Sequence, residues 1–216
     1  MNTVALGLIL ALLSTASPAG YAAEEVEYER YLQRYHDEQD AEVQAFGYEP
    51  VQDIQAAGRT VRRVFVRDFW AAHYVIQAEL TGDGSVRVEV STFERRPPTK
   101  IMGRANWDAL FRLETAGLRP RELMRRDPKD PPPPPPALCH GTSFYLAATG
   151  PGGLRQNSWD CHQATDPTRQ GVRIYAEALA RLALTAHDCA AEGQVESDLE
   201  RCFPPPTGLL TAPAGP

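Results

Sequence analysis

The residues whose types and spacing could carry chemistry lie between Ala137 and Gln163, where two Cys-His dipeptides flank a Gly-Pro-Gly-Gly turn. The runs on either side of this turn lean apolar, and this pattern predicts a β-hairpin. With the turn centred on Gly150, Cys139 lies opposite Cys161. Opposed Cβ atoms in a sheet are about 4.5–5.5 Å apart, so this alignment predicts a disulfide between the two cysteines.

On the other face of the same predicted hairpin, His140 lies opposite Asp160 and Thr142 lies opposite Ser158. A hydroxyl, an imidazole and a carboxylate are the parts of a nucleophilic triad. However, a flat sheet face supplies no donors for an oxyanion, and the sequence has no Gly-x-Ser-x-Gly elbow. We therefore interpret these residues as cross-strand polar pairs and predict no catalytic residue.

The duplicated Cys-His dipeptides also suggest a Cys₂His₂ metal site. Successive side chains of a strand point to opposite faces, so each histidine would point away from its neighbouring cysteine. His140 and His162 share a face and Asp160 could add a third ligand, but such a set makes a weak site. We predict no bound metal and no cofactor. A hydrolase or metal-binding protein that uses His140, Asp160 and His162 is the alternative that we retain for the function.

Residues 1–22 have the pattern of a secretory signal peptide. The apolar run from Val4 to Leu13 is shorter than the roughly 20 residues that a membrane-spanning helix requires. Small residues follow it, and Gly20 and Ala22 suit cleavage after Ala22, although no Lys or Arg precedes the apolar run. We expect a periplasmic or secreted protein with no membrane span once the signal is removed.

All four cysteines lie in the C-terminal part of the chain. An even number of cysteines in an exported protein favours disulfides over metal binding or redox chemistry. Four cysteines allow three pairings. We predict Cys139–Cys161 and Cys189–Cys202, because each of these pairs closes a local loop.

Acidic and basic residues are unevenly distributed along this chain of net charge −6. Residues 24–42 contain eight acidic side chains and two arginines, whereas residues 59–126 are rich in arginine. Arginine-rich surfaces occur in nucleic-acid-binding proteins. Mutual neutralisation of the acidic and the basic part suits an exported protein better, so we expect no nucleic-acid partner.

The segment from Glu24 to about Phe46 has no Gly or Pro and predicts a helix. Tyr28, Tyr31 and Tyr35 are three and four residues apart and therefore share one face. We expect this face to cover a sheet. The alternative is an exposed surface for a protein partner in the cell envelope, which complete burial of the three tyrosines would exclude.

Three strands are predicted before the proline-rich region. The arginines of the first suit a sheet edge or a solvent-exposed face. The other two strands form a hairpin. Their apolar residues lie on the same face only if the loop is Gly82-Asp83-Gly84 with Gly84 in the left-handed conformation. In that register Glu79 lies opposite Arg87. The predicted strands are residues 60–67, 74–80 and 86–92.

Two further helices are predicted at 102–117 and 168–189, and an apolar stripe places Cys189 on the buried face of the second. The proline run between them favours an extended connector. The predicted organisation is therefore a signal at 1–22, an α+β part at 24–126, a connector at 127–136, a hairpin and helix at 137–203 and a flexible tail at 204–216.

Hairpins need no parallel crossovers, so these elements predict an α+β fold. We expect an antiparallel sheet built from two hairpins and one further strand, with helices packed on one face and a disulfide-stapled C-terminal half. Two subdomains hinged at the proline run are the alternative. The function that we expect is a non-catalytic binding or accessory module in the envelope or outside the cell, with an unknown partner.

Overall fold

The computed structural model describes residues 19–67, 73–93, 95–118, 141–160, 166 and 169–204, with the backbone alone at 19–29. These residues form five helices and six strands, which confirms the α+β class. None of the described helices is both long enough and apolar enough to cross a membrane. The elements in chain order are α1 (Ala19–Ala45), α2 (Val51–Ala56), β1 (Thr60–Arg67), β2 (Tyr74–Leu80), β3 (Val86–Thr92), β4 (Lys100–Met102), α3 (Arg104–Gly117), β5 (Ser143–Ala148), β6 (Arg155–Trp159), α4 (Gln170–Ala186) and α5 (Val195–Cys202).

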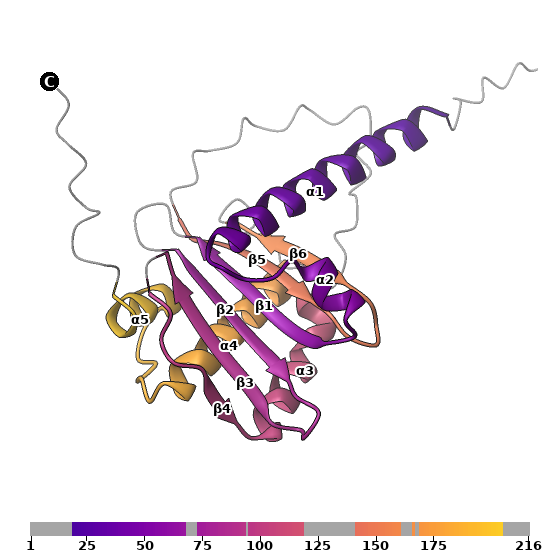
Figure 1. Ribbon diagram of the computed structural model, residues 1–216. Helices are drawn as coiled ribbons and strands as arrows, with labels where there is room; N and C mark the ends of the chain where they lie inside the picture. Colours follow the sequence, from indigo (N-terminus) through magenta and orange to yellow (C-terminus); the bar gives the residue numbers. More distant parts are fainter. Residues whose placement is uncertain are drawn as a thin grey trace, which may run out of the picture.

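The six strands form one antiparallel sheet in the order β4-β3-β2-β1-β5-β6 (Figure 1). The predicted β2–β3 hairpin is confirmed, because Glu79 pairs with Arg87 and Gly84 has a φ of 83°. The amide of Gly84 donates to the carbonyl of Thr81 at 2.9 Å, and the amide of Thr81 donates to the carbonyl of Ser85 at 3.0 Å. Local turn chemistry therefore sets this register.

The predicted register of the β5–β6 hairpin is wrong. Leu146 pairs with Asn157 instead of Leu154, and Ser158 pairs with Tyr145 instead of Thr142. The reason is a loop that runs from Thr149 to Leu154, in which both Gly150 and Gly153 have positive φ angles. The turn is therefore not centred on Gly150. The cysteines of the first predicted disulfide, Cys139 and Cys161, lie outside the described residues.

The position of β1 also differs from the prediction, because this strand lies in the middle of the sheet and not at an edge. Arg62 and Arg63 are 4% and 1% exposed. Alternation along the strand turns them to opposite faces. Their charges are balanced by buried carboxylates, and not by the solvent contact that the sequence suggested.

Helices α3, α4 and α5 cover one face of the sheet and enclose the larger hydrophobic core. The apolar stripe predicted for α4 is buried from Val172 to Leu182. The helix ends at Ala186, so Cys189 lies beyond it and is partly buried. A disulfide between Cys189 and Cys202 joins the end of α4 to α5, as predicted. Of the helices on this face, α3 and α4 were predicted together with the disulfide, whereas α5 was not predicted.

Helices α1 and α2 lie over the opposite face of the sheet (Figure 1). They enclose a second, smaller core, in which α1 contributes Val43 and α2 contributes Val51. Phe46 and Tyr48, from the segment between the two helices, complete it above Phe65 of β1. The sheet is thus covered on both faces, by very unequal amounts of apolar surface.

The outer edge of β6 is occupied by side chains. Asn157 accepts a hydrogen bond from the amide of its own neighbour, Ser158, at 2.9 Å. The carbonyl of Ser158 accepts a hydrogen bond from Arg169, whose side chain also donates to Asn157 at 2.7 Å. Arg169 is 4% exposed. The backbone groups of Ser158 therefore have partners that do not come from another strand.

Candidate functional site beneath helix α1

Polar side chains are buried between α1 and the sheet, where a protein of this size usually places apolar ones. We call this group the polar layer. Each of its members is less than a tenth exposed. The polar layer consists of Asp40, Tyr48, Arg63, Gln77 and Ser91.

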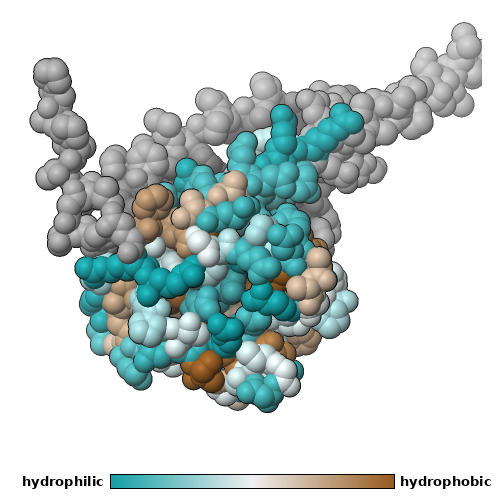
Figure 2. Space-filling view, viewed as in Figure 1, coloured by the Kyte–Doolittle hydropathy of each residue, from teal (hydrophilic) through white to brown (hydrophobic). Residues whose placement is uncertain are grey.

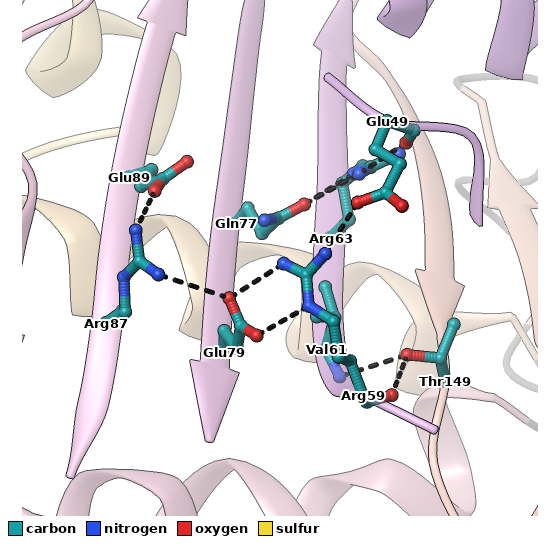
Figure 3. A network of polar contacts seen from close by, with 9 residues as sticks. All are labelled: Glu49, Arg59, Val61, Arg63, Gln77, Glu79, Arg87, Glu89 and Thr149. Carbon is teal, nitrogen blue, oxygen red and sulfur yellow. Dashed lines mark hydrogen bonds and ion pairs between the residues drawn. The ribbon is translucent and has the colours of Figure 1, made fainter. Parts of the chain in front are cut away.

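Arg63 is the centre of the polar layer, and Figure 3 draws it beside Gln77 and Glu49. Its Nε and Nη2 atoms donate to Oε1 of Gln77 at 3.0 and 2.7 Å, and Nη2 also donates to the carbonyl of Glu49 at 2.9 Å. The guanidinium lies 5.2 Å from the centre of the Tyr48 ring. Three of the polar contacts of Arg63 are therefore made to neutral groups.

The carboxylate that balances Arg63 belongs to α1. Nη1 of Arg63 lies 3.6 Å from Oδ1 of Asp40, a distance that allows an ion pair but no hydrogen bond. Oδ2 of Asp40 accepts a long hydrogen bond of 3.4 Å from the amide of Val51. Burial raises the pKa of Asp40, although the positive charge of Arg63 acts in the opposite direction. The pair is thus buried but poorly hydrogen-bonded.

Tyr48 extends the polar layer towards β3. Its ring contacts two guanidinium groups, that of Arg96 at 4.6 Å and that of Arg63 at 5.2 Å from the ring centre. Ser91 donates to the hydroxyl of Tyr48 at 3.1 Å, and Arg96 donates to Ser91 at 3.0 Å. Burial raises the pKa of Tyr48, so the phenol is neutral at physiological pH.

A row of ion pairs crosses the exposed part of the same sheet face (Figure 3). Arg59 makes two hydrogen bonds to Glu79, at 2.8 and 2.9 Å, and one to Glu49 at 2.5 Å. Arg87 lies 3.9 Å from Glu79 and 3.2 Å from Glu89. The hydrogen bonds from Arg59 lower the pKa of Glu79. Opposite charges alternate along this row, so it presents no surface of a single sign.

The other face of the sheet holds the second buried arginine. Nε of Arg62 donates to Glu114 of α3 at 2.7 Å, and its Nη1 donates to the carbonyls of Val61 and Thr149. Glu114 is 3% exposed and also pairs with Arg155 of β6. This carboxylate therefore joins one helix to two strands and has a structural role.

The predicted tyrosine face is neither fully buried nor fully exposed. Tyr31 is 55% exposed, Tyr35 is half-buried, and the side chain of Tyr28 lies outside the described residues. Burial raises the pKa of Tyr35, and the negative charge of Asp160 adds to this effect.

The residues of the alternative function are only partly described. Asp160 is the described member, whereas His140 and His162 lie outside the described residues. Within the described ranges, no three His, Cys, Asp or Glu side chains are grouped so that they could hold a metal ion. A hydrolase or metal site at His140, Asp160 and His162 therefore stays a prediction.

Arg62, Arg63 and the carboxylates opposite them were missed by the sequence interpretation. A possible signal was the position of both arginines inside a β-branched and aromatic run, Thr60–Arg67, which is typical of a buried strand. The balancing residues Asp40 and Glu114 are distant in sequence, and nothing in their local pattern identifies them as partners.

Comparison with known proteins identifies no family for this sequence. No protein-family model matches the sequence, and none of the curated proteins matches it.

Proposed function

We propose that this protein is an exported, non-catalytic binding or accessory module of the cell envelope or the extracellular space. The signal pattern of residues 1–22 and the Cys189–Cys202 disulfide support export to an oxidising compartment. The observation that carries the binding role is the exposure of Tyr31 on α1.

Helix α1 extends beyond the body of the protein and exposes side chains there. Its 27 residues give a length of about 40 Å, and its N-terminal end extends past the sheet (Figure 1). Tyr31 is 55% exposed on this helix. Tyrosine is enriched among the residues that dominate protein–protein binding. The face of the molecule that Figure 2 shows is mostly hydrophilic, with hydrophobic side chains in small separate areas.

Photocrosslinking in the exporting cell tests this proposal. A photoreactive phenylalanine derivative is placed at Tyr31 or at Arg34, one helical turn away and also exposed. We expect both positions to form an adduct with the same protein partner. The matched control is Phe111 of α3, which is 60% exposed on the opposite side of the sheet and should not form this adduct.

Three results would contradict the proposal: no adduct from either position on α1, unrelated adducts from the two, or the same adduct from Phe111. Any of these would show that α1 is not the contact surface of a defined partner.

A further inference from the structure

The body of the protein has a core that does not depend on α1. Among the side chains that the structure describes, twenty-six buried residues form the hydrophobic cluster between the sheet and helices α3, α4 and α5, and none of them comes from α1 or α2. Within the same described part, the cluster beneath α1 has eight buried residues, of which Val43 is the member from α1. The free energy gained by apolar burial is proportional to the area removed from water. This term therefore stabilises the attachment of α1 far less than it stabilises the body of the protein.

The polar contacts of α1 do not make up for this small apolar contact. Asp40 and Arg63 are both buried without a hydrogen bond between them. A buried ion pair stabilises a structure only if its geometry is good and its remaining hydrogen-bonding groups are satisfied. The second ion pair to α1, between Glu42 and Arg67, is half-exposed at 3.7 Å and contributes little.

The surface beneath α1 has the composition of a binding site. Phe65, Val75, Tyr145 and Ala147 form an apolar area next to Arg63, and all of them are at most 3% exposed. This area is covered by α1 together with Phe46 and Tyr48 of the segment that follows it. Arg63 keeps Nη1 without a hydrogen bond. The complementary ligand therefore has apolar side chains beside a carboxylate, which α1 itself provides with Val43 and Asp40.

We propose that the sheet face beneath α1 is a binding surface, that α1 is its lid, and that a partner replaces α1 with an amphipathic helix carrying a carboxylate. This inference rests on the proposed binding function and adds a second surface, which lies beneath α1, together with the chemistry of the partner that this surface takes. A carboxylate within hydrogen-bonding distance of Nη1 would make a contact that α1 lacks. This difference in affinity is what displacement of α1 requires.

Hydrogen exchange of the full chain tests the lid. The variant Val43→Asp places a charge in the apolar contact of α1, and Ala41→Asp adds the same charge at an exposed position of the same helix. We expect the amides of residues 35–45 in Val43→Asp to lose protection by about 10- to 100-fold, the effect of losing one buried aliphatic side chain. The amides of α4 should be unchanged, and Ala41→Asp should resemble the wild type.

A peptide supplied in trans tests the surface. The probe is a labelled peptide with the sequence of residues 30–50, and its fluorescence anisotropy reports binding. We expect it to bind the Val43→Asp chain at least about tenfold more tightly than the wild-type chain, in which the lid competes. A peptide with Asp40→Lys should bind neither chain, because its positive charge would face Arg63.

The inference is overturned if α1 and α4 lose protection together, if Val43→Asp leaves α1 protected, or if the peptide does not distinguish the two chains. None of these measurements uses the natural partner. A failure to crosslink from Tyr31 would therefore contradict the proposed function without deciding whether α1 is a lid.

Discussion

Arg62 and Arg63 are neighbours in the sequence, yet their buried charges are balanced differently. Arg62 shares a short hydrogen bond with a carboxylate and donates to two carbonyls. Arg63 is 3.6 Å from its carboxylate and donates mainly to an amide oxygen and a carbonyl. The first arrangement fixes α3 to the sheet, whereas the second leaves α1 less firmly attached.

The charge of Glu114 is expected to be essential for stability. Glu114→Gln leaves Arg62 buried without its counter-charge, which should lower the free energy of unfolding by about 3–5 kcal/mol. Urea denaturation measures this change. Asp108→Asn is the matched control, because it breaks an exposed pair with Arg104 and should change stability by less than about 1 kcal/mol. Equal losses in the two variants would show that burial of Glu114 does not matter.

The free energy of unfolding should depend on pH through the titration of Asp40. Burial raises the folded-state pKa of Asp40 above the ordinary value of 3.8. The protonated side chain therefore stabilises the folded state fully below pH 3.8, and this stabilisation is lost as the pH rises through the folded-state pKa. Between pH 4 and pH 7, the wild type should therefore lose stability relative to Asp40→Asn. Urea denaturation of both proteins across this range measures the difference. A relative gain of the wild type with rising pH would contradict it.

At the scale of elements, the helix pair α3–α4 depends on close backbone approach. A Cβ atom at Gly117 would collide with the side chain of Tyr175, and one at Gly171 would meet Ala116. These glycines allow α4 to lie against α3 across the larger core. In contrast, α1 contacts the sheet through the ion pair of Asp40 with Arg63, the buried Val43 and the ring contact of His36 with Tyr145 at 5.7 Å.

Gly117→Ala should therefore destabilise the protein by about 1–3 kcal/mol, because the added methyl group forces the two helices apart. The control is Gly82→Ala, where an added Cβ has no neighbour within 4 Å and stability should change by less than about 0.5 kcal/mol. Thermal unfolding of both variants gives the comparison. A Gly117→Ala protein as stable as its control would mean that Tyr175 can move aside at no cost.

The elements also show where sequence interpretation succeeds. The β2–β3 hairpin was predicted to the residue because alternation and one left-handed glycine, Gly84, determine it locally. The β5–β6 register was missed because Gly150 and Gly153 together make a longer turn. The central position of β1 was not predicted, because arginine usually indicates a solvent-exposed position. The carboxylates that balance its arginines, Asp40 and Glu114, contact the strand only in the folded chain.

At the scale of the whole molecule, we expect the disulfides of the C-terminal half to form only if the protein is exported to an oxidising compartment. Cys189–Cys202 joins α4 to α5, and the pairing of Cys139 with Cys161 remains a prediction. Intact mass of the exported protein, with and without reductant, tests both expectations together. We expect a chain that lacks residues 1–22 and that gains two hydrogens for each disulfide upon reduction. A bound metal or two free thiols would contradict the predicted pairing and favour the metal-binding alternative.

The occupied edge of β6 has a consequence for how this protein behaves in a crowded compartment. An exposed strand edge is a template on which other chains can add strands, and this is a common start of amyloid-like aggregation. At Ser158 the template is blocked, because Asn157 and Arg169 already bind its amide and its carbonyl. The opposite edge, β4, is only three residues long and begins with a lysine. Addition of a strand is therefore hindered at Ser158 on one edge of the sheet and limited to three residues on the other.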